Sequence, residues 1–414
     1  MNQQMGRWVL LAFLGGVLAW ALWSIMTRPS EEETGRAEGA PASAEWAQVV
    51  EQAKGQTVHF YAWGGSEAIN QYIAWVGQQV KARYGVTLEH VRLDDTAVAV
   101  NKIIGENQAG KHTGGSVDLI WINGANFATL KQANLLYGPV LPNLPNQAYL
   151  DPASPLVTHD FGLPTEGYEV PWGAAQFVMV YDSARTPQPP RSLPALVEWA
   201  KNNPGQFTYP QASSFIGMTF LKHLLYMAEG GPSTFQVPFD EATFARRATH
   251  YADVLADLTP HLWQQGQSYP PTQARLDEML ANGEVAFSMH FNPAEASSLI
   301  AQGLYPETVR TMVFDEGTIA NTHFVALPYN GKSNAGAQVV ANFLLGPEAQ
   351  LEKANPEIWG DFTVLEMNRL PSDWQQQFAN QPRGPATLPP AELAPKLPEP
   401  PAGWSEHLQR IWMR

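Results

Sequence analysis

The sequence predicts an α/β fold with a mostly parallel sheet and helices on its faces. The first observation is a regular alternation of strand-like and helix-like segments between residues 57 and 139, the pattern typical of a parallel sheet flanked by helices. The second is the length of 414 residues, which suits more than one compact lobe because single cores rarely exceed roughly 250–300 residues. The third is a globular composition, 44% hydrophobic and 15% charged.

The N-terminal segment predicts export. Arg7 precedes an uncharged apolar run, Trp8 to Met26. A helix of about 19 residues spans close to the ~30 Å hydrocarbon core of a membrane and exceeds the usual ~7–15 residue core of a signal peptide. We therefore expect residues 1–28 to be an uncleaved anchor, with a cleaved signal peptide as the alternative. Residues 29–45, rich in Glu, Gly, Ala and Pro, are predicted to form a flexible tether.

The first part of the body alternates strands and helices. "TVHFYAW" (57–63) has the β-branched and aromatic content of a buried strand, and from Glu67 the apolar residues follow helical spacing, with Ser66 as a plausible N-cap. "YGVTLEHVRL" and "SVDLIWING" predict two more strands. Helices are predicted at 98–108 and 125–139.

The second part begins with a long strand, "VPWGAAQFVMVYDSA", which is long enough to leave one lobe and enter another. Helices are predicted within 192–202, 213–231, 240–263, 275–282 and 334–350, and strands within 284–290 and 323–330. The proline-rich segment 381–403 is unsuited to a helix or a central strand. We expect it to be extended and held at its end by the amphipathic "WSEHLQRIWMR".

The order of these segments carries a resemblance that covers the body from Thr57 to Arg414. "YAWGG", "VPWGAAQFVMVYD", "LANGEVAFSM", "GTIANTHFVALPYNGKSNAGAQVVANFLLGPEAQ" and "PEIWGDFTVLEMNRLP" occur in the order typical of periplasmic solute-binding proteins of ABC importers. The chain is similar to the branch that includes polyamine- and thiamine-type binding proteins.

The resemblance implies a two-lobed periplasmic-binding-protein fold, the type II clamshell with crossover hinge strands. Lobe 1 would comprise residues 46–177 and 290–332, and lobe 2 residues 178–289 and 333–414. It further implies that a monomer captures a small solute between the lobes by hinge closure and delivers it to ABC permease subunits in the inner membrane. The chain departs from the family in its N-terminus, where we expect the helix to be kept, so we expect the protein to be periplasmic and tethered.

Candidate ligand-binding residues in lobe 1 follow its strands. In open α/β sheets, ligands gather at the carboxyl ends of the strands, where helices begin. Trp63 could stack on a flat or cationic group, and Gly64 and Gly65 would allow close backbone approach beside Ser66. Asn123 stands in the next such turn.

Other candidates flank the expected crossings between lobes. Trp172 and Gln176 lie before the first crossing, Ser213 and Ser214 open a long helix, and Asn292 follows a strand near the return. Each also has a structural explanation: tryptophans near hinges are often core residues, and paired serines are good helix caps. His290 and His323 more often have structural roles.

Charge and composition exclude other classes of protein. The formal net charge of −14 argues against nucleic-acid binding and slightly favours an organic cation, such as a polyamine or a thiamine-like molecule. The chain has no cysteine, so it has neither disulfides nor thiolate metal sites. We expect no cofactor, no bound metal and no catalytic residue, since no nucleophile elbow, phosphate loop or metal-ligand spacing is present. Two alternatives stay open: a membrane-tethered sensor or scaffold with the same clamshell, and a cleft enzyme.

Overall fold

The computed structural model describes residues 43–413 apart from 236, 238 and 402. The predicted anchor and all but the last residues of the predicted tether lie outside this range. The body from Ala40 onward forms one compact unit. Among its described helices, none is both long enough and apolar enough to cross a membrane.

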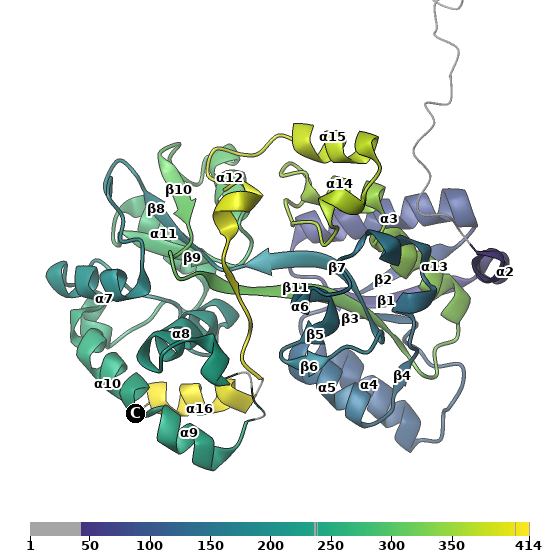
Figure 1. Ribbon diagram of the computed structural model, residues 1–414, viewed down its shortest axis with the longest axis horizontal. Helices are drawn as coiled ribbons and strands as arrows, with labels where there is room; N and C mark the ends of the chain where they lie inside the picture. The colour runs from purple at the N-terminus through teal and green to yellow at the C-terminus, as the bar shows by residue number, and fades with distance from the viewer. Residues whose placement is uncertain (1–42, 236, 238, 402, 414) are drawn as a thin grey trace, which may run out of the picture. The chain divides into compact units, whose positions relative to one another are not determined.

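A seven-stranded sheet organises the first part of the body, and its strand order is β12-β11-β3-β1-β2, with β4 and β7 also paired to β11 (Figure 1). The β1 strand pairs in parallel with β2 and β3, whereas β11 runs antiparallel to β3 and β7. The α/β fold predicted from the alternation is confirmed, but the sheet is mixed rather than mostly parallel, because β11 pairs antiparallel with β3, β4 and β7. The strands are β1 (Thr57–Trp63), β2 (Thr87–Leu93), β3 (Leu119–Ile122), β4 (Leu136–Tyr137), β7 (Glu169–Gln176), β11 (Thr318–Pro328) and β12 (Lys396–Leu397).

Helices cover both faces of this sheet. The α13 helix packs against α2 and α3, and α4 packs against α5 over the other face, where Ile120, Ile122 and Phe127 are buried together. The α3 helix ends at Gly85, whose left-handed backbone (φ 69°) favours glycine. The helices of this part are α2 (Ala44–Ala53), α3 (Glu67–Tyr84), α4 (Ala97–Gln108), α5 (Gly124–Gln132), α13 (Asn334–Leu344), α14 (Pro347–Ala354) and α15 (Ser372–Asn380).

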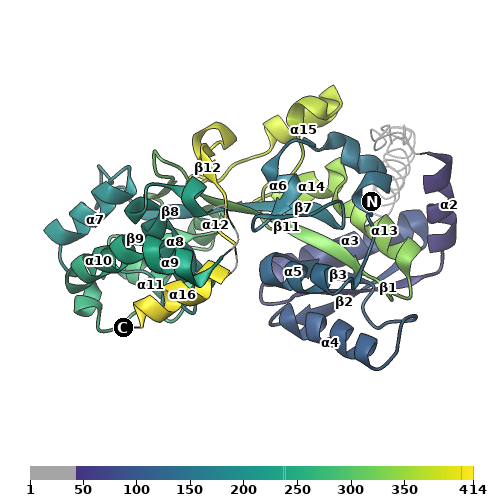
Figure 2. The ribbon, with the colours of Figure 1, turned by 60° about the horizontal axis from the view of Figure 1, so that its bottom comes forward.

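A three-stranded antiparallel sheet, in the order β10-β8-β9, organises the second part (Figure 2). Its strands are β8 (Val178–Asp182), β9 (Phe287–His290) and β10 (Val309–Met312). Its helices are α7 (Leu193–Asn202), α8 (Phe215–Ala228), α9 (Glu241–Arg247), α10 (Thr249–Leu258), α11 (Gln273–Asn282), α12 (Glu295–Ala301) and α16 (Gly403–Trp412). We call the part that carries β1–β4 and β7 lobe 1 and the part that carries β8–β10 lobe 2; β11 extends from one to the other, and its first residues, paired with β12, pack with the core of lobe 2.

Shorter elements complete the fold. The β5 (His159–Asp160) and β6 (Leu163–Pro164) strands form a small hairpin after α6 (Pro155–Thr158). Single 3₁₀ turns occur at η1 (Leu141–Asn143), η2 (Pro145–Tyr149), η3 (Pro232–Phe235), η4 (Thr259–His261), η5 (Trp263–Gly266), η6 (Met367–Arg369) and η7 (Pro390–Leu393).

The chain passes between the sheets at places that differ partly from the expectation. The first passage, at Phe177 between β7 and β8, lies within a residue of the expected position. The return was expected near Met289, but β9 and β10 both pair with β8, so residues 309–312 stay with lobe 2. The third passage was expected near Lys332, yet α13 packs against α2 and α3 of lobe 1. Strand pairing and helix packing, which join segments distant in sequence, set these boundaries.

The C-terminal segment returns to lobe 2. The β12 strand pairs in parallel with the start of β11, and Lys222 of α8 forms a buried ion pair with Glu399 (2.8 Å). The α16 helix packs against α8, and its Trp404 is fully buried beside Phe235 (ring centroids 4.8 Å apart). The predicted extended segment held by a terminal helix is therefore present.

Candidate functional site

The turn after β1 lies at the carboxyl end of the parallel strands, and it leaves Trp63 exposed. Trp63 ends β1 and is 40% exposed. Gly65 lies against its ring, because a Cβ at Gly65 would be 2.3 Å from Cζ2 of Trp63. Ser66 is the N-cap of α3, and within the described chain its side chain makes no capping hydrogen bond. The first amide groups of α3 and the face of Trp63 are therefore available at this edge.

Gly64 has a structural role in the same turn. Its N–H donates to the carbonyl of Leu93 (2.9 Å), and its carbonyl accepts from the side chain of Asn70 (3.0 Å). A Cβ there would come within 2.5 Å of the Cβ of Arg92. These contacts hold β1, β2 and α3 together below Trp63.

In the turn after β3, another segment of the protein occupies the start of the next helix. Asn123 is the half-buried N-cap of α5, but the N–H of Gly124 donates to a carboxylate oxygen of Asp160, which lies on the β5–β6 hairpin. Burial raises the pKa of Asp160 to about 7. It also raises the pKa of the neighbouring Glu169 well above its ordinary value, with the Asp160 charge as a second cause. The two carboxyl groups thus form a buried pair that favours a bound proton.

Trp172 was expected to stack on a ligand, but the structure places it in the protein interior. It is fully buried, and its ring contacts Trp121 edge-on (4.9 Å) and stacks on Tyr72 (6.3 Å). Every residue of β7 is buried, although β7 pairs with β11 alone in the sheet, with a bulge beside Trp172. In this conformation Trp172 supports Trp121 and has no surface for a solute.

Gln176 is also withdrawn from solvent. Its side-chain amide donates to Thr318 Oγ1 (2.9 Å) and to the carbonyl of Leu393 (2.7 Å). Gln176 therefore fixes the first passage between the sheets against β11 and the C-terminal segment, which is a hinge role.

The start of α8 presents the candidates of lobe 2. Ser213 is exposed, and Ser214 is the N-cap of α8 without a side-chain capping bond to any described residue. The next residue, Phe215, is 49% exposed and contacts Phe291 edge-on (5.0 Å). This contact brings the start of α8 beside Asn292, the residue after Phe291.

Asn292 is half-buried and joins two segments. Its Oδ1 accepts from the N–H of Ala294 (3.0 Å), and its Nδ2 donates over 3.5 Å to the carbonyl of Trp359. Trp359 lies 6.0 Å from Trp121 of lobe 1. The structure thus connects the start of α8, Asn292, Trp359 and Trp121 in one run of contacts between the lobes.

Trp359 is a residue that the sequence analysis missed. Its segment contributed only to the family resemblance, and no helical or strand periodicity marks it. A tryptophan next to Gly360 and Asp361 in a segment with neither pattern was the available signal. Trp359 is 9% exposed, and its ring also contacts Tyr72, Trp172 and His323.

A buried ionic network lies beneath Trp359. Lys353 Nζ is 2.5 Å from Asp361 Oδ2, and His323 Nε2 is 3.1 Å from Asp361 Oδ1. Burial lowers the pKa of Lys353, while Lys353 and His323 hold the pKa of Asp361 below its ordinary value against the effect of burial. His323 therefore has a supporting role, with its ring stacked on Trp359.

His290 is likewise internal. Burial alone would lower its pKa, but the carboxylate of Asp277, 2.8 Å from its Nε2, raises the pKa to about 8. Tyr305 and Ser288 also donate to Asp277. Across the described part of the chain, no group of three or more histidine or acidic side chains is arranged to hold a metal ion.

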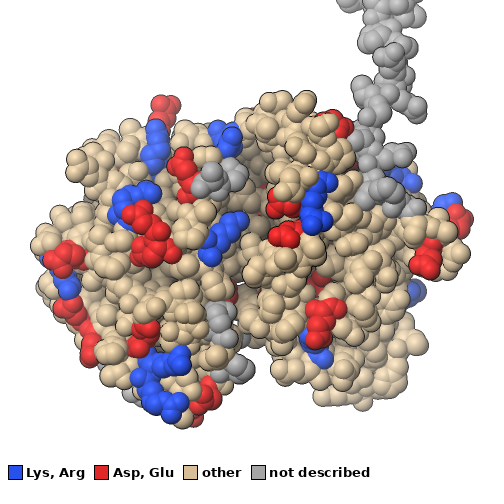
Figure 3. Space-filling view, viewed as in Figure 1, with Lys and Arg blue, Asp and Glu red and all other residues tan. Residues whose placement is uncertain are grey.

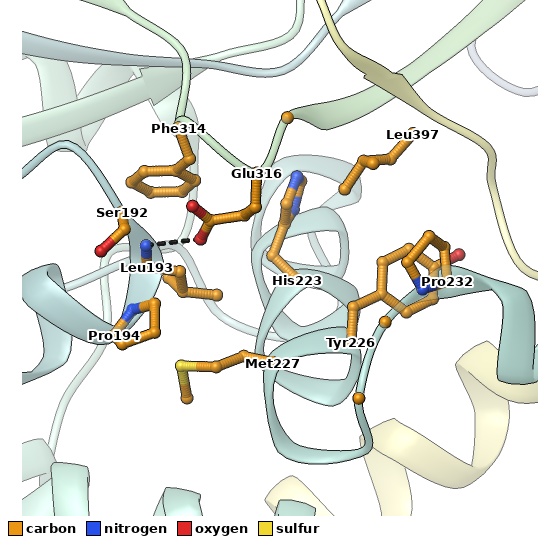
Figure 4. A pocket seen from close by; sticks show the side chains of 13 residues that line it. Ser192, Leu193, Pro194, His223, Tyr226, Met227, Pro232, Phe314, Glu316 and Leu397 are labelled. Carbon is orange, nitrogen blue, oxygen red and sulfur yellow. Dashed lines mark hydrogen bonds between the residues drawn. The ribbon is translucent and has the colours of Figure 1, made fainter.

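Two hollows are visible in the body. Figure 3 shows a hollow on one face between the part that carries β1–β3 and the part that carries β8–β10, with acidic and basic side chains scattered on both sides. The second is a cavity of about 350 Å³ in lobe 2, beside α8 and the start of α7 (Figure 4).

The lobe 2 cavity is lined mainly by apolar side chains, among them Leu193, Tyr226, Met227 and Leu397. Its polar groups are engaged: Glu316 accepts from the N–H of Leu193 (2.7 Å), and His223 donates to Thr219 O and accepts from the N–H of Ile319. Burial lowers the pKa of His223 to about 4, so its ring is neutral. None of the candidate ligand-binding residues lines this cavity.

Comparisons with known proteins agree with one another. Residues 75–382 match the family described as bacterial extracellular solute-binding protein. The chain is 46% identical over 374 residues to protein YnjB of Escherichia coli K12, covering 90% of this chain and 94% of that protein.

Two solved structures share the fold. The spermidine/putrescine substrate-binding protein PotD of Streptococcus pneumoniae, at 17% identity, superposes with a TM-score of 0.62 over 86% of this chain and 98% of its own. A periplasmic thiamin-binding protein, at 16% identity, superposes with a TM-score of 0.55 over 86% of this chain and 95% of its own.

Proposed function

The chain belongs to the bacterial extracellular solute-binding protein family, and we propose that it binds its solute between the two lobes, at the Trp63 turn and the start of α8. As a member of that family it captures a small solute outside the cytoplasm. The proposed site comprises Trp63 and Ser66 on lobe 1, with Ser213, Ser214 and Asn292 on lobe 2. Asn123 borders it.

The observation that carries the proposal is the pairing of an exposed aromatic ring with an uncapped helix start on each lobe. Trp63 accompanies the start of α3, and Phe215 accompanies the start of α8. An exposed aromatic ring offers a flat surface on which a solute can stack, and helix starts supply oriented N–H donors. A solute held by both lobes would stabilise the closed arrangement over the open one.

The chemistry of this edge supports a small polar or cationic solute. An exposed tryptophan face attracts cations and flat rings. Asp94, exposed in the turn after β2 at the same end of the sheet, adds negative charge. The α5 helix start, which would favour an anion, is already occupied by Asp160.

Delivery to an ABC permease completes the proposed role. PotD and a second relative in Listeria monocytogenes are described as parts of spermidine/putrescine ABC transporters, which supports a permease partner here. We further propose that residues 1–28 tether the body to the inner membrane and that the protein binds without turnover. Co-purification with permease subunits supports this partner, whereas recovery of a signalling receptor instead would favour the tethered-sensor alternative.

Thermal-shift measurement of the purified full chain against polyamines, thiamine forms, amino acids, sugars and short peptides tests the binding site. A solute at about 100 times its Kd adds about 2.7 kcal/mol of stability. With that solute, Trp63→Ala should weaken binding about tenfold, or ~1.4 kcal/mol. Met227→Ala, which alters the lobe 2 cavity, is the matched control and should leave affinity unchanged. Loss of binding in Met227→Ala with normal binding in Trp63→Ala would move the site to that cavity.

A further inference from the structure

One loop contacts both lobes outside the strands that pass between them. Residues 355–362, which we call the Trp359 loop, follow α14 of lobe 1. The loop is folded back on itself: the N–H groups of Gly360 and Asp361 both donate to the carbonyl of Lys353 (3.0 and 3.2 Å). Its shape is therefore set locally and does not depend on a bound solute.

On one side the loop packs against the edge of lobe 2. Asn292 donates to the carbonyl of Trp359, and Ser298 of α12 donates to the carbonyl of Pro356 (3.4 Å). Gly360 has a left-handed backbone (φ 77°), and a Cβ there would lie 2.8 Å from the Cβ of Ala294. Only glycine allows this approach without moving Ala294.

On the other side the Trp359 ring packs into lobe 1. It contacts both Trp121 near the carboxyl end of β3 and His323 of β11, with ring centroids 6.0 and 6.1 Å apart. The buried Lys353–Asp361–His323 network orients this contact, with Lys353 Nζ 5.5 Å from the ring centroid.

We propose that Trp359 is a positioning residue that couples solute binding to the arrangement of the lobes. It links Asn292 of lobe 2 to Trp121 of lobe 1, so any movement of one lobe edge relative to the other changes the contacts of Trp359. Trp359 sets the orientation in which the side chain of Asn292 contacts the solute. The inference rests on the proposed function, since it takes the solute to bind between the lobes.

Distances between spin labels test this inference without any solute. The chain has no cysteine, so Gln78→Cys on α3 and Ala256→Cys on α10, both exposed, give one label on each lobe. In the ligand-free protein, Trp359→Ala should broaden the distance distribution about twofold, because it removes the ring that packs the loop against Trp121, and the loop carries the hydrogen bonds to lobe 2. Trp359→Phe should restore most of the original width.

Two further variants separate positioning from a general loss of packing. Gly360→Ala leaves the ring in place but displaces the loop from Ala294, and it should also broaden the distribution. Trp75→Leu is the matched control: Trp75 stacks on Tyr72 (5.9 Å), which Trp359 also contacts (5.6 Å), but Trp75 lies on α3 of lobe 1, whereas the Trp359 loop accepts a hydrogen bond from Asn292 of lobe 2. It should lower the melting temperature without changing the distance.

The outcomes distinguish this inference from the proposed function. If Trp359→Ala and Gly360→Ala give distributions that superimpose on that of the unchanged protein, the inference is wrong, whatever the solute. If they broaden it but Trp63→Ala leaves solute affinity intact, the coupling stands and the proposed contact at Trp63 fails. With a known solute, Trp359→Ala should weaken binding about tenfold while circular dichroism stays unchanged.

Discussion

At the edge of the seven-stranded sheet, the turn after β1 leaves Trp63 exposed, whereas the turn after β3 packs Trp121 against Trp172. Each turn follows a strand that carries a tryptophan near its end, and each has a glycine at or just before the start of the next helix. In the first turn the start of α3 is not capped by the side chain of Ser66, while in the second Asp160 accepts from the first N–H of α5. The comparison teaches that similar residues at one sheet edge can serve either a solute or the interior.

The largest expected difference between the two turns is in stability. Trp121→Ala should lower the free energy of unfolding by about 3–5 kcal/mol, since its ring contacts Trp172, His323 and Trp359, whereas Trp63→Ala should cost no more than about 1 kcal/mol. Denaturant titration of both variants measures this. Equal losses of stability would mean that Trp63 is a packing residue, and the two turns would then not differ in this respect.

The second expected difference is in the pH dependence of stability, which arises at the turn after β3. The pKa of Asp160 is raised to about 7 in the folded protein, above its ordinary value of 3.8, so the folded state keeps a proton that the unfolded state loses. The stabilising contribution is therefore complete below pH 4 and is lost as pH rises through 7. Between pH 5 and 7 it should fall by about 2 kcal/mol.

Asp160→Asn isolates this contribution. Its amide can still accept from Gly124 and donate toward Glu169, but it does not titrate. Melting temperatures measured from pH 5 to 8 should fall less steeply in Asp160→Asn than in the unchanged protein. Parallel curves would show that the carboxyl pair does not hold the extra proton.

The smallest difference concerns helix capping. Ser66→Ala should change stability by only a few tenths of a kcal/mol, because the hydroxyl of Ser66 caps nothing. Ser192→Ala, the matched variant at the start of α7, should cost about 1 kcal/mol, since Ser192 Oγ accepts from the N–H of Ala195. Similar losses in both variants would mean that Ser66 caps α3 in solution.

The fold was predictable from the sequence because its signals are local. The buried strand 57–63, the helix from Glu67 and the terminal amphipathic helix each follow from residue spacing within one segment. Lobe boundaries were less accessible, because β10 joins the sheet of lobe 2 through its pairing with β8, more than a hundred residues earlier. Spacing within residues 290–332 contains no information about that partner.

The candidate site was predictable only in part. Trp63 and Ser66 were expected at a strand end, and the structure leaves them open there. Trp172 was expected in the same role, but it stands in the middle of the buried strand β7, where rings from segments distant in sequence, Tyr72, Trp121 and Trp359, enclose it. Asp160 and Trp359 reach the site from a hairpin and a loop whose sequence has no periodicity.

The burial of Trp404 has a consequence for biosynthesis. Lobe 2 begins with β8 at Val178, yet the rings of Phe235, Phe239 and Phe244 surround Trp404, more than two hundred residues later. During synthesis this cluster stays incomplete until the α16 helix emerges. Lobe 2 therefore cannot reach its native packing until nearly all of the polypeptide has been made. Delayed folding of lobe 2 suits a polypeptide that must cross a membrane in an unfolded state before it folds.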